Sequence, residues 1–167
     1  MTQRCARSTP PRPAVRPRLG TLKSEGTDCL LSDNVDALPL LDLAGGRPGV
    51  EAIVEAFYGL VASDAPLRAI YPDDLEPGKE KLKLYFEQWL GGEPRYSALY
   101  GHPRLRMRHF PFAIDERAAG RWLRHMRHAM QTNGVPPEAE RIIFEKLGPL
   151  ARHMVNVSSE FRVPSSE

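Results

Sequence analysis

Long apolar runs are missing from this sequence. No stretch approaches the roughly 18 apolar residues that a membrane-spanning helix requires. The N-terminus also lacks the apolar core of a secretory signal. We therefore expect a cytoplasmic protein with no membrane partner.

Cysteine is scarce as well. Cys5 and Cys29 are the only two, and both lie in an N-terminal region whose composition predicts disorder. They give no basis for a structural disulfide, and two thiols are too few for a cysteine-based metal site. The sequence also lacks a glycine-rich phosphate loop and a serine or cysteine nucleophile motif.

Neither sign of charge is in marked excess. The chain has 23 Lys and Arg against 21 Asp and Glu, a net charge of +2, which demands no polyanionic partner. The basic, partly aromatic run over residues 104–112 is a weak sign of a nucleic-acid patch. Because acidic residues elsewhere balance it, we expect no nucleic-acid partner.

Acidic residues are absent from residues 1–23, which carry five Arg, one Lys and four Pro. Such a segment cannot bury enough apolar surface to offset the entropy of ordering it. We expect a disordered basic, proline-rich tail over 1–40, a folded domain over 41–158 and a disordered end over 159–167. The tail is interpreted as a tether, an organelle address or a solvated extension.

Helical spacing is present throughout the rest of the chain. Apolar residues recur three and four positions apart, as in Val50, Ile53, Val54, Phe57, Leu60 and Val61. Asp64 and Asp115 are placed to cap helices. No segment alternates convincingly with period two, so the sequence predicts an all-α fold of about five or six helices. It also predicts an irregular connection over 93–102 and a kink or split at Pro149, because proline lacks the helical N–H.

The segment GHPRLRMRHFPF, residues 101–112, places a histidine at the end of a short helix. Leu105 and His109 lie four apart and can both face inward, and Pro111 disfavours helix at the residue before it. A free carbonyl at the helix end can accept from one ring nitrogen and leave the other for a metal. A haem would use such a histidine as an axial ligand. The alternative is a hydrogen-bonded core histidine.

The other histidines carry weaker signals. His125 and His128 lie three apart on one predicted helix, which is compatible with zinc ligands but lacks cysteine or carboxylate partners in the same cluster. We expect His128 to be solvated. His153 lies near the end of the last helix and is interpreted as structural.

Aromatic residues lie on several predicted helices that must share one core: Phe57, Tyr58, Tyr71, Tyr85, Phe86, Trp89 and Trp122. A buried Tyr or Trp usually needs a partner for its O–H or N–H. Several such donors facing one void would suit a diatomic ligand. The alternative is aromatic core packing with every donor satisfied.

Taken together, these features resemble a known family, the group II truncated haemoglobins of bacteria. The resemblance covers residues from about 42 to 156, and GHPRLRMRHFPF followed by a Trp thirteen residues beyond its second His is its most specific part. The other matching stretches are AFYGLVASDAPLRAIYPDDL, YFEQWLGG, RWLRHMRHAM and LARHMVN. The resemblance implies a globin-like two-over-two helical sandwich that encloses one b-type haem.

The same resemblance implies roles for individual residues. It makes His109 the proximal iron ligand and places Tyr58, Tyr71 and Trp122 on the distal side, as donors to bound O₂. It puts Gly78 and Leu82 on the distal helix, where glycine would open a side entrance. The remaining residues expected at the haem are Phe86, Phe57 and Met126, and those expected at the propionates are Arg108, Arg106, Lys81 and Tyr96.

The function implied is binding of O₂, and of other diatomics such as NO and CO, for sensing or scavenging rather than bulk transport. An alternative is a redox enzyme, a peroxidase or NO dioxygenase. It would need a separate reductase because the chain has no flavin or nicotinamide domain. A third interpretation is a helical binding module without haem. The resemblance is also compatible with a homodimer.

Overall fold

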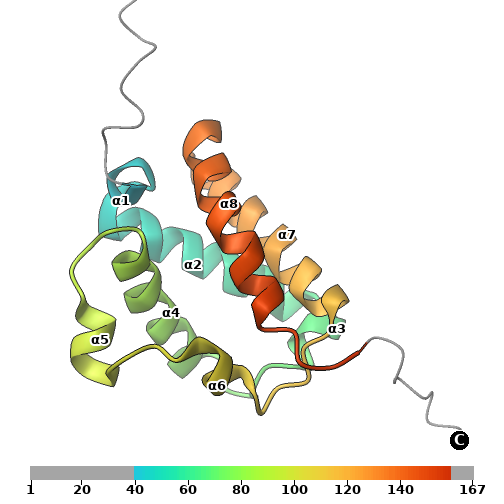
Figure 1. The fold of residues 1–167 in the computed structure, drawn as a ribbon. Helices are drawn as coiled ribbons and strands as arrows, with labels where there is room; N and C mark the ends of the chain where they lie inside the picture. The colour runs from blue at the N-terminus through green and yellow to red at the C-terminus, as the bar shows by residue number, and fades with distance from the viewer. Residues whose placement is uncertain (1–39, 159–167) are drawn as a thin grey trace, which may run out of the picture. The chain divides into compact units, whose positions relative to one another are not determined.

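The computed structural model describes residues 40–158, so the tail and end predicted to be disordered lie outside the described residues, apart from Leu40. The described part is helical throughout, without a strand, which confirms the all-α prediction (Figure 1). Its helices are α1 (Leu40–Leu43), α2 (Gly46–Ser63), α3 (Ala65–Arg68), α4 (Glu76–Trp89), α5 (Arg95–Tyr100), α6 (Leu105–His109), α7 (Glu116–Thr132) and α8 (Pro137–His153).

Helix α2 begins where two glycines turn the chain. Gly45 has φ 84° and Gly46 φ 65°, a left-handed conformation that glycine adopts without steric cost. Gly49 must also be glycine, because a Cβ there would lie 1.9 Å from the Ala44 carbonyl oxygen. Beyond this turn, the apolar stripe predicted from the sequence is buried along α2.

The two predicted aspartate caps are confirmed. Asp64 accepts a hydrogen bond from the Leu67 backbone N–H at 3.3 Å and so caps α3. Asp115 accepts from the Ala118 N–H at 2.7 Å at the start of α7. Each carboxylate satisfies a backbone donor that has no partner within the helix.

The prediction of an irregular connection over 93–102 is wrong, because α5 occupies Arg95–Tyr100. Side chains of α4 hold this short helix in place. Glu87 pairs with Arg95 at 3.3 Å, and the Gln88 amide accepts from the Ser97 N–H and donates to the Ser97 hydroxyl, both at 2.9 Å. A six-residue helix has little stability of its own, so these tertiary contacts sustain it.

The expected split of the last helix at Pro149 is also wrong. Helix α8 runs without interruption from Pro137 to His153, and Pro149 is exposed near its C-terminal end. The residue before a proline is pushed out of the helical region by a clash that involves its Cβ. Gly148 has no Cβ, so that part of the clash is absent.

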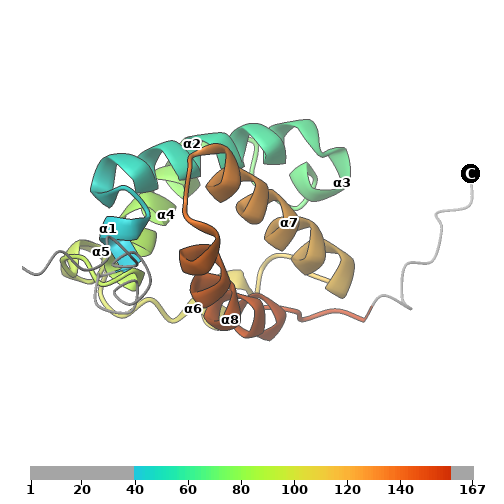
Figure 2. The same ribbon diagram turned by 90° about the horizontal axis from the view of Figure 1, so that it is seen from above.

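The long helices form two packed pairs. Helix α2 packs on both α4 and α7, and α7 packs on α8, which lies beside it in both ribbon views (Figures 1 and 2). Fully buried side chains between them include Ile53, Phe57, Met126 and Ile143. This arrangement agrees with the two-over-two sandwich expected from the sequence. Within the described residues, no helix has the length and apolar character needed to cross a membrane.

Candidate functional site

His109 ends α6, and its ring is fixed on one side. Its Nδ1 lies 2.8 Å from the Leu105 carbonyl oxygen, one helical turn earlier. Among the described residues, none hydrogen-bonds Nε2, and the half-buried ring leaves this nitrogen accessible. With Nδ1 as the donor, Nε2 carries the lone pair that a metal requires. The predicted geometry of an axial imidazole is therefore present.

The three predicted distal donors lie together. The rings of Tyr58 and Tyr71 meet edge to face with centroids 5.9 Å apart. The Phe57 ring packs against both Tyr58 and Trp122, with ring centroids 5.5 Å and 5.2 Å apart. Helices α2 and α7 and the turn after α3 thus bring one cluster of aromatic side chains to one place.

Burial sets the protonation state of the two tyrosines. Removal from water raises the pKa of both the Tyr58 and the Tyr71 hydroxyl well above the ordinary value of 10.0. For Tyr71, a polar contact with Trp122 opposes this rise. Both hydroxyls therefore keep their protons at neutral pH and can donate hydrogen bonds.

Gly78 lies directly against this cluster. A Cβ at position 78 would stand 2.9 Å from the Tyr58 hydroxyl oxygen, which is too close for both to keep their places. Gly78 itself is exposed, so a surface residue without a side chain lies close to the Tyr58 hydroxyl. This position is consistent with the side entrance expected at Gly78.

The other residues expected at the haem fall into two groups. Leu82 is half-buried on α4 and packs against the core. Phe86 is buried and stacks on Trp89 with ring centroids 5.7 Å apart. Phe57 and Met126 are completely buried, so they belong to the core as much as to the cluster.

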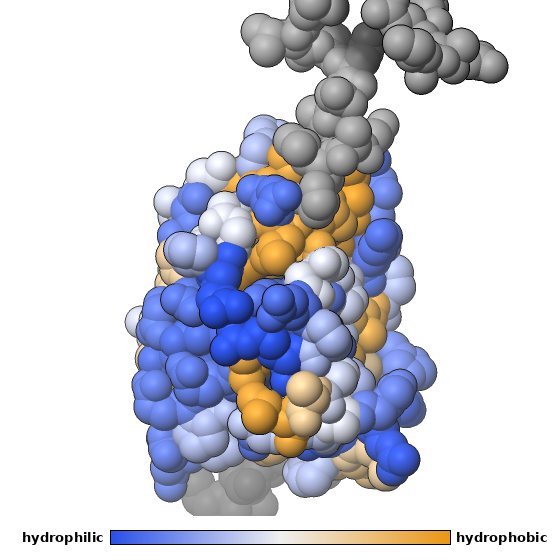
Figure 3. Space-filling model, turned by 90° about the vertical axis from the view of Figure 1, so that its left-hand side faces the viewer, coloured by the Kyte–Doolittle hydropathy of each residue, from blue (hydrophilic) through white to orange (hydrophobic). Residues whose placement is uncertain are grey.

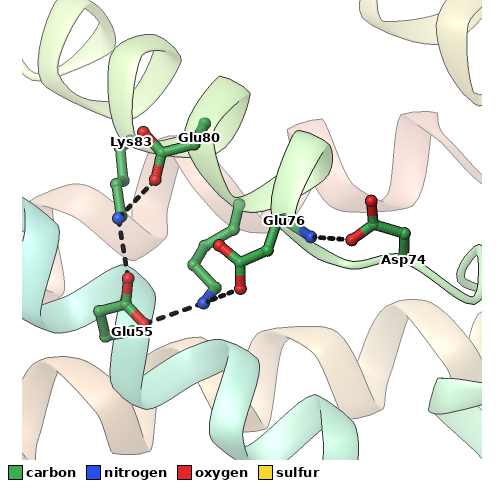
Figure 4. A network of polar contacts seen from close by, with 6 residues as sticks. Glu55, Asp74, Glu76, Glu80 and Lys83 are labelled. Carbon is green, nitrogen blue, oxygen red and sulfur yellow. Dashed lines mark hydrogen bonds and ion pairs between the residues drawn. The ribbon is translucent and has the colours of Figure 1, made fainter.

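An ion-pair network fastens α4 to α2 (Figure 4). The Glu55 carboxylate of α2 lies 3.1 Å from Lys79 Nζ and 2.8 Å from Lys83 Nζ, both on α4. Hydrogen bonds from Lys83 and then Lys79 lower the pKa of the Glu55 carboxyl. Because Glu55 is exposed, each pair contributes little stability; the network links α4, which carries Gly78, to α2, which carries Tyr58.

The predicted propionate contacts are only partly assembled. The Arg108 guanidinium lies 5.9 Å from the centroid of the buried Tyr96 ring, and Lys81 Nζ lies 5.6 Å from that of Tyr100, whose ring contacts Tyr96. These residues come from α4, α5 and α6, and the surface on the α5 side is largely hydrophilic with apolar areas above and below (Figure 3). Both arginines donate to backbone carbonyls: Arg108 to those of Pro103 and Tyr100, beside this group, and Arg106 to that of His153, away from it.

A mainly apolar cleft of about 430 Å³ lies beside α6. Its walls include Leu105, whose carbonyl accepts from His109, and Tyr85, which follows Leu82 by three residues. Ligand pockets in proteins typically measure about 300–1,000 Å³ and are mostly apolar. His109 and the aromatic cluster do not line this cleft, so the fit to a haem rests on their chemistry: an imidazole with an accessible nitrogen, aromatic O–H and N–H donors, and cations on α4 and α6.

Sequence reasoning missed several side chains that build this site. Asn156 bonds the backbone of the His109 segment, and Asp64 pairs with Arg121 and His125 of α7. His125 was considered only as a zinc ligand. Asp64 was predicted to cap a helix, but nothing local predicts a second partner on α7. A single Asn after a helix carries no signal of its own.

Comparison with known proteins agrees with this architecture. A family model described as bacterial-like globin matches residues 39–156. Group 2 truncated hemoglobin YjbI of Bacillus subtilis (strain 168) is 41% identical over 111 residues, which cover 66% of this chain and 84% of that protein.

Solved structures give the same result. The group II truncated hemoglobin of Bacillus anthracis has a TM-score of 0.71 and 38% identity, covering 75% of this chain and 96% of its own. The hemoglobin of Chloroflexus aurantiacus has a TM-score of 0.69 and 41% identity, covering 72% of this chain and 99% of its own. The chain therefore belongs to the bacterial-like globin family, among the group II truncated haemoglobins.

Proposed function

We propose that this globin binds one b-type haem through His109 and holds O₂, or another diatomic such as NO or CO, beside Tyr58, Tyr71 and Trp122. The observation that carries the proposal is the imidazole of His109, whose Nδ1 bonds the Leu105 carbonyl while Nε2 has no partner among the described residues. When bound, the haem iron supplies a reversible binding position for a diatomic ligand.

The distal side chains would determine how long such a ligand stays. Tyr58, Tyr71 and Trp122 offer O–H and N–H donors from a largely buried cluster, where hydrogen bonds are stronger than in water. Two net hydrogen bonds of about 1 kcal/mol each would slow release roughly 30-fold. Slow release suits sensing or scavenging better than bulk transport.

One relative supports a tight-binding role. The solved haemoglobin of Bacillus subtilis that is described as oxygen-avid shares 39% identity with this chain at a TM-score of 0.67. A cytoplasmic location, a separate reductase and a homodimer are further proposals that rest on the sequence and its resemblance.

The test is a haemin titration of the purified protein followed by absorption spectroscopy. We expect a Soret band that saturates at one haem per chain and is weakened or shifted in His109→Ala. His128→Ala is the matched control, because His128 is exposed on α7 and should leave the band unchanged. A wild-type protein without a specific band would refute the proposal. A His109→Ala variant with the wild-type spectrum would refute the assignment of the ligand.

A further inference from the structure

Asn156, which follows α8, uses its whole side chain to hold the segment that contains His109. Its amide nitrogen donates to the carbonyls of His109 at 3.2 Å and Phe112 at 2.8 Å. Its amide oxygen accepts from the Ile114 backbone N–H at 3.0 Å. The backbone of residues 156 and 157 adds two bonds to the Ile114 carbonyl, at 2.9 and 3.2 Å. Residues 109–114 are therefore fastened to the chain after α8.

This attachment matters because α6 cannot fix His109 by itself. The helix has five residues and none of them is buried. A helix this short is marginal without tertiary contacts, and the carbonyls of its last turn lack partners within the helix. The His109 carbonyl accepts from the Phe112 backbone N–H at 3.1 Å, and the Asn156 amide adds a second donor that comes from beyond α8.

Two bonds then define where Nε2 of His109 points. The ring is tied to its own helix through Nδ1 and the Leu105 carbonyl. The backbone at the same residue is tied to Asn156. The first bond orients the ring on the helix, and the second, together with the bond from Arg106 to the His153 carbonyl, ties the helix to the end of α8 and the chain after it.

We propose that Asn156 is a positioning residue for His109, which sets the direction from which the imidazole reaches an iron. The inference rests on the proposed function and deepens it. Only a side chain with both a donor and an acceptor can make these three bonds. Asp would keep the acceptor for Ile114 but would place a carboxylate against two carbonyl oxygens.

The test compares Asn156→Ala and Asn156→Asp with Asn133→Ala. Asn133 is a matched control, because its amide donates at 2.8 Å to the Ala129 carbonyl at the end of α7, far from His109 in sequence. The main readout is the iron–histidine stretching band of the ferrous protein in resonance Raman spectra. The second is haem transfer to a competing apoglobin, and the third is amide hydrogen exchange at Ile114 in the apoprotein.

We expect both Asn156 variants to shift or broaden the iron–histidine band. Both should also release haem about fivefold faster, the effect of losing the one bond to the His109 carbonyl, which neither variant can make. Exchange at Ile114 should be faster in Asn156→Ala than in Asn156→Asp, which keeps its acceptor. Asn133→Ala should lower thermal stability without moving the band. This pattern would support a positioning role, since a purely structural role would not move the band.

An unchanged band in both Asn156 variants would overturn the inference while leaving haem binding intact. An equal shift in Asn133→Ala would also overturn it, because the effect would then reflect general loosening. A wild-type protein that takes up no haem would instead refute the proposed function, so the two failures are distinguishable.

Discussion

Asp64 Oδ2 and His125 Nε2 lie 2.8 Å apart, although 61 residues separate them in the sequence. The same carboxylate accepts from Arg121 Nη1 at 3.1 Å to each oxygen, and it caps α3. One side chain therefore links the start of α3, which leads to Tyr71, to α7, which carries Trp122. This link therefore joins the segments that carry two of the proposed ligand donors.

The Asp64 link predicts a pH-dependent contribution to stability. The hydrogen bond with His125, followed by that from Arg121, lowers the pKa of the Asp64 carboxyl below its ordinary value of 3.8. A carboxyl whose pKa is lower in the folded than in the unfolded protein stabilises the fold at any pH above its ordinary pKa. This stabilisation is lost as the pH falls through the pKa of the folded state. Asp64→Asn should therefore lower the melting temperature near neutral pH, and the difference should shrink below about pH 4.

Asp73→Asn provides the control for this measurement, because Asp73 is exposed in the turn after α3. Its melting temperature should follow that of the wild type across the same pH range. A difference for Asp64→Asn that is independent of pH would contradict the electrostatic explanation.

Removing the distal donors should speed ligand release. Trp122→Phe and Tyr58→Phe each delete one N–H or O–H while keeping an aromatic ring in the cluster. We expect the O₂ dissociation rate in stopped-flow experiments to rise about fivefold for each and roughly 30-fold for the pair. Tyr100→Phe is the control, since Tyr100 is exposed on α5. Dissociation rates that match the wild type in all variants would show that these side chains do not donate hydrogen bonds to O₂.

Gly78 and Tyr58 should behave as a coupled pair. Gly78→Ala introduces a Cβ 2.9 Å from the present position of the Tyr58 hydroxyl, so the hydroxyl must move. We expect altered O₂ association and dissociation rates in Gly78→Ala and a smaller change in the Tyr58→Phe background, where no hydroxyl is displaced. The double-mutant cycle should give an interaction energy of about 0.5–3 kcal/mol. Strictly additive effects would contradict the contact.

Replacing Arg108 should speed haem loss, whereas replacing Arg106 should not. Arg108 lies near Tyr96, within the group that includes Lys81, whereas Arg106 donates to a carbonyl of α8. Arg108→Gln should release haem about threefold to fivefold faster, as expected for one exposed ion pair. Arg106→Gln should release it at the wild-type rate. The order of the two haem-loss rates decides the assignment, and equal rates would refute it.

The fold was predictable where the signal was local. The stripe from Val50 to Val61 and the aspartates that start α3 and α7 act within one helix, so the sequence alone predicts them. Helix α5 was not predictable, because Glu87 and Gln88 of another helix sustain it. The split expected at Pro149 is wrong because proline alone indicates a break, whereas the preceding glycine removes part of the clash.

In the candidate site, too, local features were predictable from the sequence and long-range contacts were not. The position of His109 at a helix end predicted that a nearby free carbonyl would accept from one ring nitrogen, and the Leu105 carbonyl, one turn earlier, does so. Which arginine lies beside Tyr96 was not predictable, since Arg106 bonds the His153 carbonyl, 47 residues later, while Arg108 contacts α5. Asn156 was missed for that reason also: its partners lie 42–47 residues earlier in the chain.

The separation of His109 and Asn156 in the sequence also affects when their contact can form during synthesis. The ribosome makes His109 forty-seven residues before Asn156. The contact between them cannot form until the end of α8 has left the exit tunnel, when every other described helix has already emerged. A nascent chain that meets haem before then offers the imidazole on a loop not yet fastened. The attachment of the His109 segment to Asn156 therefore forms last.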